Sequence, residues 1–390
     1  MDHIEKAVTA YPELAERYSA MGALFDKKLW HQLTGVLSTF LHDESNRRGD
    51  NFVQLYSEFI IKFEGKLNQL ELAKLMGPIV GSFADAEGKY KFIDALLEKT
   101  VRLGAEATLL ITLLRLHVKL QTRPVDATPE ARAATMLELK KDMEAKKIEV
   151  DALQGVADTV IHATFYDLAS EYYKEAGPPE DYYKHALMLL SYSSMESLGP
   201  EKAMKLATDM SLAALSGDGV YNFGEVLATP IVGALDNTPN AWLGEMLRVF
   251  NRGDIQAFGV LYNSHKADFD AQPALMYRMD FIKEKLTLLA LMNFVFETPS
   301  EERTIPFAAV AEHCVVPEEQ VEWMAMRAIS LGLIKGSMDQ VDQTLTVDWV
   351  QPRVLDNGQM KHLADRLGGW AIKVEETSRF IEDQTLELGI

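Results

Sequence analysis

The sequence predicts a mainly α-helical protein: a right-handed α-solenoid of degenerate TPR-like helix pairs, then a winged-helix module, then one long C-terminal helix. Apolar residues recur three and four positions apart through most of the chain, as they do on one face of a helix. After Thr298-Pro299 this pattern gives way to short helical and strand-like segments, and a heptad pattern begins beyond Leu355. The expected domains are therefore residues 1–298, 299–353 and 354–390.

The helical array is predicted from its periodic segments. A pair of helices is expected at 160–190, where Gly177-Pro178-Pro179 separates a first apolar stripe of bulky residues from a second that carries the small Ala186. Such a hairpin cannot bury its apolar face alone, so it needs stacked neighbours, as in an α-solenoid. No strict repeat period is visible, which makes the repeats degenerate. Further helical segments are expected at 24–41, 52–67, 105–120, 129–148, 201–215, 222–235, 240–250 and 254–263. At 251–254, Gly253 is expected to end one helix and Asp254 to cap the start of the next.

The middle domain has the order of elements that is typical of a winged helix. A strand-like Thr304-Ile305 precedes two helical runs, and two strands follow at 333–337 and 344–350, with Asp339-Gln340 in the connecting loop. An edge strand has unpaired N–H and C=O groups that can bind a strand of a neighbouring protein. We expect 344–350 to be that edge. The candidate interface residues are Thr344, Thr346 and Val347.

A heptad seam runs along the expected terminal helix. Apolar residues there alternate between spacings of three and four, which is the pattern of a helix that packs against other helices. The spacing leaves two possibilities open: the helix folds back on its own domain, or it enters a bundle with other chains. The candidate interface residues are Met360, Leu363, Leu367, Trp370, Val374 and Ile381.

Composition and charge indicate a soluble chain whose partners are proteins. The formal net charge is −19, which repels nucleic-acid phosphates and anionic membranes, so neither is an expected partner. Cys314 is the single cysteine, so no disulfide framework is possible and a reducing compartment is expected. The chain has no run of 18 apolar residues, and Met1–Lys6 is not a signal peptide.

No catalytic, cofactor-binding or metal-binding motif is found. The nearest match to a phosphate-binding loop, 81–89, has the wrong spacing, and the glycines at 217, 219 and 224 fit turns better than a dinucleotide fingerprint. None of the nine histidines has a second histidine two or four residues away, as a metalloprotease would need. Cys314 follows His313 directly, but adjacent helical residues point in different directions, which favours a buried structural thiol. We therefore expect a protein that is not an enzyme and takes no small-molecule substrate.

The charge of the winged helix disfavours DNA binding. Between Ser300 and Pro352 there are nine acidic residues and three basic ones, Arg303, Arg327 and Lys335. The helix that would enter a major groove begins with Glu318, Glu319 and Glu322, which would face phosphates. This module is expected to bind protein.

Short stretches along nearly the whole chain resemble one family. They are 27–34 (KKLWHQLT), 165–168 (FYDL), 182–187 (YYKHAL), 217–225 (GDGVYNFGE), 331–337 (LGLIKGS) and 349–356 (WVQPRVLD). Together with the order of domains, they resemble the PCI-domain proteins of the proteasome lid, the COP signalosome and translation initiation factor three. These stretches are most similar in sequence to the PCI-type non-ATPase subunits of the proteasome's regulatory lid.

The resemblance implies a non-catalytic scaffold in ubiquitin-dependent protein degradation, without cofactor, in the cytoplasm and nucleus. The implied partners are other lid subunits of PCI and MPN type in a hetero-oligomer, near the ubiquitin-receptor subunit. Its winged helix would pack edge to edge with a neighbouring PCI subunit, and its last helix would join a bundle of C-termini. A scaffold subunit of the signalosome or of the initiation factor is the alternative.

Overall fold

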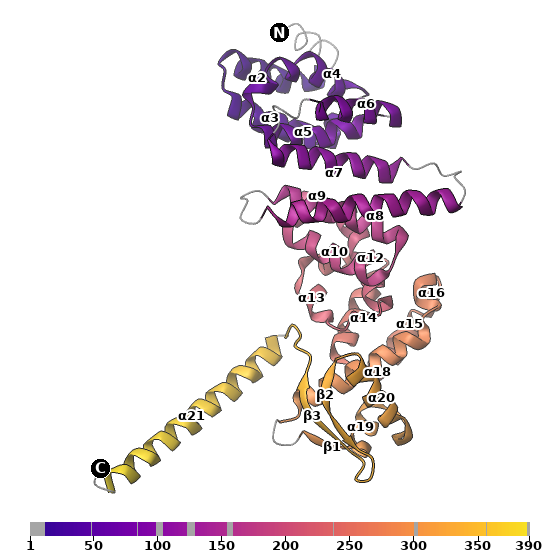
Figure 1. Ribbon diagram of the computed structural model, residues 1–390, viewed down its shortest axis with the longest axis vertical. Helices are drawn as coiled ribbons and strands as arrows, with labels where there is room; N and C mark the ends of the chain where they lie inside the picture. The colour runs from indigo at the N-terminus through magenta and orange to yellow at the C-terminus, as the bar shows by residue number, and fades with distance from the viewer. Residues whose placement is uncertain are drawn as a thin grey trace. The chain divides into compact units, whose positions relative to one another are not determined.

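The fold class that the sequence predicts is confirmed by the structure, a computed structural model. It describes residues 12–47, 49–83, 85–98, 104–122, 129–153, 159–236, 238–299, 303–355 and 357–387. The chain divides into two compact units, Met1–Ser194 and Met195–Ile390, and Figure 1 colours them from indigo to magenta and from magenta to yellow. The N-terminal Met1–Lys6, for which no signal peptide was expected, lies outside the described residues.

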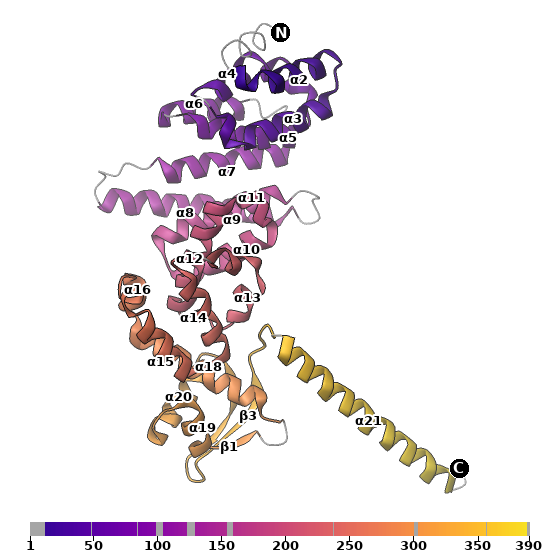
Figure 2. The same cartoon turned by 180° about the vertical axis from the view of Figure 1, so that it is seen from behind.

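The secondary-structure elements in the described part of the N-terminal unit are all helices, joined by short turns. Its core is one continuous cluster of apolar side chains from Tyr18 to Tyr172, to which each long helix up to α9 contributes. Helices α7, α8 and α9 contact one another, as both Figure 1 and the reverse view in Figure 2 show. The α-helices are α2 (Ala15–Asp26), α3 (Trp30–His42), α4 (Asn51–Glu58), α5 (Gln69–Ser82), α6 (Ala86–Leu97), α7 (Ala105–Gln121), α8 (Pro129–Asp151), α9 (Val160–Ala176) and α10 (Pro179–Tyr192). Short 3₁₀ helices lie at Pro12–Leu14, Glu44–Asn46, Ile60–Lys62 and Glu64–Lys66.

Two of the predicted helical segments are wrong in detail, because tertiary packing interrupts them. The segment 24–41 breaks between α2 and α3, where Lys28 adopts a left-handed φ of 56° and Trp30 turns to stack on Phe63 at 5.6 Å. The segment 52–67 is helical only as far as Glu58, and 3₁₀ turns follow that bury Ile60 and Phe63. Apolar spacing alone cannot distinguish a tight turn of this kind from a continued helix.

The hairpin expected at 160–190 is confirmed as α9 and α10. Its turn is Gly177-Pro178, with Gly177 at a φ of 66° that favours glycine. The bulky side chains of Phe165 and Leu168 are buried on α9, and the small Ala186 is buried on α10, so the two helices can approach closely. This pairing of large and small residues is the packing that the sequence predicted.

The C-terminal unit begins with a second helical group. The segment predicted as one helix at 222–235 is two, because Pro230 lacks an N–H and forces Thr229 into an extended conformation. The prediction at 251–254 is confirmed: Gly253 ends α14 at a φ of 65°, and the Asp254 carboxylate accepts a hydrogen bond from the Ala257 N–H. The elements are α11 (Met195–Leu198), α12 (Pro200–Ser216), α13 (Phe223–Ala228), the 3₁₀ helix η5 (Pro230–Leu235), α14 (Ala241–Arg252), α15 (Ile255–Ser264), α16 (Lys266–Asp270), α17 (Pro273–Met276) and α18 (Met279–Glu297).

A winged-helix module follows in the same unit. Its elements are β1 (Thr304–Pro306), α19 (Phe307–Cys314), α20 (Glu318–Ser330), β2 (Ile334–Asp339) and β3 (Thr344–Val350). The strand order is β1-β3-β2, with both pairs antiparallel. The prediction that 344–350 is an edge strand is therefore wrong, because β1 returns to pair with β3 on the side opposite β2. Asp339 is also the last residue of β2 rather than part of the loop.

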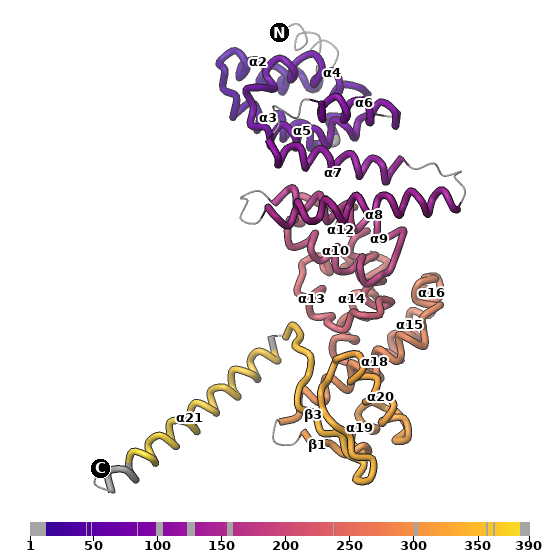
Figure 3. The backbone as a smooth tube through the Cα atoms, viewed as in Figure 1, coloured from indigo at the N-terminus to yellow at the C-terminus, as the bar shows by residue number. Residues whose placement is uncertain are grey.

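The chain ends in α21 (Asn357–Glu387), the long helix that the heptad pattern predicted. Figure 3 shows it as one continuous helix at the yellow end of the tube. It is 31 residues long, which is enough to cross a bilayer. Among the described residues, however, no helix combines such length with the apolar character that a membrane span requires.

Candidate protein-interaction surfaces

The seam of α21 is an exposed apolar surface. All six of its predicted residues, Met360, Leu363, Leu367, Trp370, Val374 and Ile381, are exposed, and Trp370 is 66% exposed. Because large apolar side chains that lie together in this way normally meet a partner, the seam is the first candidate interface.

A second apolar face of α21 was missed by the sequence analysis. Ile372 and Phe380 are exposed as well. At 100° per residue, Ile372 lies about 160° around the helix from Trp370, and Phe380 lies about 80° from Trp370, between Ile372 and the seam. Gly368 and Gly369 precede them, and a Cβ added to either glycine would meet no atom within 4 Å. A helix that is apolar on two sides suits the interior of a bundle better than a single contact. Ile372 and Phe380 could have been identified from the sequence as apolar residues of the same helix, but they do not follow the heptad spacing that defines the seam.

The segment that leads into α21 is held by the helical part of its own unit. The Val354 N–H donates a hydrogen bond to Asn222 Oδ1 at 3.2 Å, and the Arg353 guanidinium lies over the Phe296 ring at 5.4 Å. A Cβ on Gly224 would stand 2.6 Å from the Val354 carbonyl oxygen. The glycine of the 217–225 stretch is therefore explained by the close approach of this segment, and its resemblance to a dinucleotide fingerprint is coincidental.

The predicted interface residues of β3 lie inside the winged-helix module. Val347 is buried, its N–H donates to the Arg303 carbonyl at 3.0 Å, and Thr344 and Thr346 are half-buried between two strands. The free edge of this sheet on the wing side is instead the outer side of β2. The backbone N–H and C=O of Val347 point toward β1, so those of the adjacent residue, Thr346, point toward its partner Ser337 on β2. Because the direction alternates along β2 as well, the backbone groups of Met338 point away from β3.

Helix α20 carries a further exposed apolar pair. Trp323 and Met326 are exposed on the outer face of the helix that DNA-binding winged helices insert into a groove. Glu319 is exposed on the same face, and Glu322 accepts a hydrogen bond from Gln340 of the wing. The mixture of aromatic, aliphatic and acidic groups matches a protein partner rather than a phosphate backbone.

The interior of the C-terminal unit holds one fully buried lysine. The Lys285 ammonium donates to the Ala214 and Gly217 carbonyls at 2.6 and 2.8 Å, at the C-terminus of α12. The rings of Tyr221 and Phe223 lie 5.5 and 5.1 Å from it. Burial lowers the pKa of Lys285 to about 7. Its contacts are with backbone and aromatic rings, so its role is to fasten the 217–223 loop onto α18.

Cys314 and His313 do not form a nucleophile and base. Cys314 is buried at 0% exposure, and burial raises the pKa of its thiol to about 12, which opposes the thiolate that catalysis needs. The His313 ring stacks on Phe294 with their centroids 4.6 Å apart. The expectation of a buried structural thiol is confirmed.

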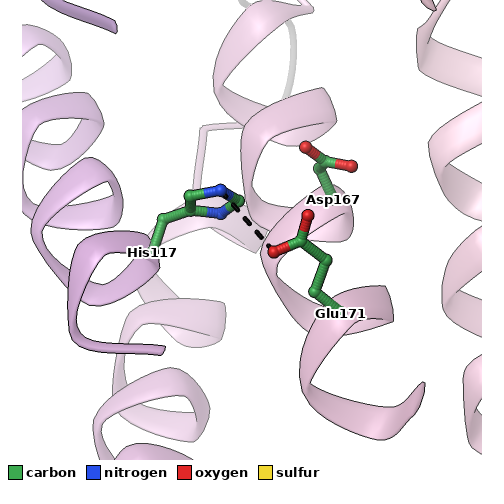
Figure 4. Close-up of side chains that lie close together, drawn as sticks. All are labelled: His117, Asp167 and Glu171. Atoms are coloured by element: carbon green, nitrogen blue, oxygen red, sulfur yellow. Dashed lines mark ion pairs between the residues drawn. The ribbon is translucent and has the colours of Figure 1, made fainter. Parts of the chain in front are cut away.

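Three ligand-type side chains meet in the N-terminal unit, which the sequence analysis did not foresee. His117 of α7 lies opposite Asp167 and Glu171 of α9, and the atoms that they offer are all within 4.8 Å of one another (Figure 4). His117 Nε2 is 3.6 Å from Glu171 Oε2, and it is also 2.7 Å from the Gln121 amide nitrogen. The search for paired histidines missed this cluster because its members are separated by fifty residues of chain.

The fold and its surfaces define a class: helical repeats that lead into a winged helix, with large apolar side chains exposed on α20 and α21. Two family models match the chain in that order. PSD13 N-terminal repeats match residues 17–247, and a PCI domain matches residues 262–349.

Full-length relatives identify the family. The chain is 36% identical over 388 residues to the 26S proteasome non-ATPase regulatory subunit 13 homolog A of Arabidopsis thaliana, covering 100% of this chain and 98% of that protein. It is 31% identical to the 26S proteasome non-ATPase regulatory subunit 13 of Dictyostelium discoideum, covering 100% and 97%. The chain belongs to the family of 26S proteasome non-ATPase regulatory subunit 13.

Proposed function

We propose that this chain is a non-catalytic structural subunit of the lid of the 26S proteasome's regulatory particle and supports ubiquitin-dependent protein degradation. The observation that carries the proposal is similarity to subunit 13 proteins along the entire chain, including the terminal helix. The exposed seam of α21 supports it, because a scaffold needs surfaces that only a partner buries.

The alternative within the PCI proteins is a subunit of the signalosome or of the initiation factor. Translation initiation factor 3 subunit M of Aspergillus terreus is 26% identical, but the similarity covers 57% of this chain and 49% of that protein. Co-purification of the tagged chain with mass spectrometry separates these cases. Proteasome subunits at stoichiometric yield would support the proposal, whereas signalosome subunits or ribosomal proteins would refute it.

The neighbours in this proposal are lid subunits of PCI and MPN type, near the ubiquitin receptor, in the cytoplasm and nucleus. No cofactor, nucleic acid, membrane or small-molecule substrate is part of it, and the working parts are residues 1–298, 299–353 and 354–390. Cross-linking of assembled particles tests the neighbours. Cleavage of ubiquitin chains by the pure protein at a rate that survives further purification would refute the absence of catalysis.

In this proposal α21 is the assembly element. Removal of residues 357–390 is expected to leave a folded chain that does not enter the particle, because the six seam side chains of α21 are exposed in the chain itself. Circular dichroism and native electrophoresis measure the two effects. Unfolding of the shortened chain would assign the helix to its own core, and normal incorporation would refute the assembly role.

The winged helix is proposed to add its β2 edge to a neighbouring PCI subunit. Proline at Met338 would remove an outward N–H and keep the internal ladder, since edge strands tolerate proline where the N–H faces outward. We expect Met338→Pro to keep the thermal stability of the free chain and to lose incorporation. Incorporation at the wild-type level would refute pairing at β2.

A further inference from the structure

The side chains of His117, Asp167 and Glu171 form a compact group of different ligand types. Asp167 and Glu171 are four residues apart on α9, so they project from the same face of that helix. His117 comes from the adjacent α7, and all three residues are half-buried. An imidazole opposite two carboxylates is a more selective arrangement than a surface cluster of acids.

The spacing of these atoms suits a tetrahedral metal ion. Zinc binds histidine nitrogen and carboxylate oxygen at about 2.0–2.2 Å, which separates neighbouring ligand atoms by roughly 3.4 Å. His117 Nε2 and Glu171 Oε2 are already 3.6 Å apart, and the widest separation in the group is below 4.8 Å. Small side-chain rotations therefore suffice to close the site, and two carboxylates with a neutral imidazole balance the charge of a divalent ion.

We propose that His117, Asp167 and Glu171 bind one divalent transition-metal ion of the zinc type, with water in the fourth position. Such an ion would link α7 directly to α9 and so clamp two layers of the helical array. A role of this kind is structural, and it needs no step of catalysis.

Gln121 provides a sharp control, because its side chain competes with the metal for the same atom. Its amide nitrogen lies 2.7 Å from His117 Nε2, so the metal must displace it. Removing this competitor in Gln121→Ala leaves all three ligands in place. The affinity for metal should then be unchanged or higher, while His117→Ala and Glu171→Gln should each lower it at least about tenfold.

The experiment uses the full-length chain after removal of metal by a chelator. Titration with Zn²⁺ in a calorimeter should give one equivalent, and Co²⁺ in its place should give the visible absorption of a tetrahedral site. Zinc should also raise the Tm of the wild type and of Gln121→Ala, with no such shift in His117→Ala. The proposal is overturned if no stoichiometric binding occurs, or if His117→Ala binds as the wild type does, which would mean adventitious binding only.

Discussion

Replacement of Gly224 by alanine tests how the root of α21 is seated. In the wild type, Gly224 lies at the start of α13 directly under Val354, whose N–H is held by Asn222. An alanine Cβ would stand 2.6 Å from the Val354 carbonyl oxygen and 2.8 Å from its Cβ. The Val354 carbonyl oxygen and Cβ cannot move without the backbone, so the 352–355 segment must shift by about 1 Å to restore ordinary van der Waals contact.

The cost follows from this displacement. Overpacking of a tight site costs about 1–3 kcal/mol, and loss of the hydrogen bond to Asn222 adds about 1 kcal/mol. We expect Gly224→Ala to destabilise the C-terminal unit by about 2–4 kcal/mol in urea unfolding. Hydrogen exchange at the amides of Gln351, Arg353, Val354 and Leu355 should become faster as the segment lifts.

Gly259 of α15 is the matched control. A Cβ there meets no atom within 4 Å, so Gly259→Ala should stabilise its helix by up to about 1 kcal/mol. If Gly224→Ala unfolds at the same urea concentration as the wild type and leaves exchange at 351–355 unaltered, the seating of Val354 on α13 is wrong.

Three further predictions concern the C-terminal unit. The pKa of Lys285 is about 7 in the folded state and 10.5 in the unfolded state, so the unfolded state binds more protons between these values and the stability of the fold rises with pH there. Relative to Lys285→Met, the free energy of unfolding in urea should therefore increase by up to about 1.4 kcal/mol per pH unit from pH 7.5 to 9. A difference between the two proteins that stays constant with pH would contradict this. Val347→Pro loses the hydrogen bond to Arg303 and a buried side chain, so the winged helix should lose at least about 2 kcal/mol by thermal unfolding, whereas a stable variant would show that β1 does not hold β3. The double substitution Gly368→Ala and Gly369→Ala should raise the helicity of the free chain in circular dichroism, because no atom obstructs the new methyl groups. The same substitution should lower incorporation into the particle if a partner helix approaches the face that carries these glycines. Full incorporation would argue against such an approach.

Helices and turns were predictable where the residues that determine them lie close together in the sequence. The α9–α10 hairpin and the Gly253-Asp254 boundary depend on residues close together in the chain, and both predictions are confirmed. The break at Lys28 was not predictable from spacing, because its cause is the stacking of Trp30 on Phe63 more than thirty residues away.

The candidate surfaces divide in the same way. The seam of α21 is a local pattern, so its residues could be named from the sequence. The place of β3 in the sheet depends on β1, which joins it from forty residues earlier, and a hairpin considered alone leaves either strand free to be the edge. The cluster at His117 likewise exists only because α7 and α9 pack together.

The physical chemistry of α21 connects its order to assembly. Two adjacent glycines in its middle each cost about 1 kcal/mol of helix stability, and its exposed apolar residues gain nothing from solvent. Burying the six seam residues in a bundle would contribute on the order of 10 kcal/mol. Because that term is several times larger than the cost of the glycines, partner helices rather than intrinsic propensity would supply most of the stability of α21. In such a bundle, the missing side chains at Gly368 and Gly369 would allow a neighbouring helix to approach the face that also carries Ile372.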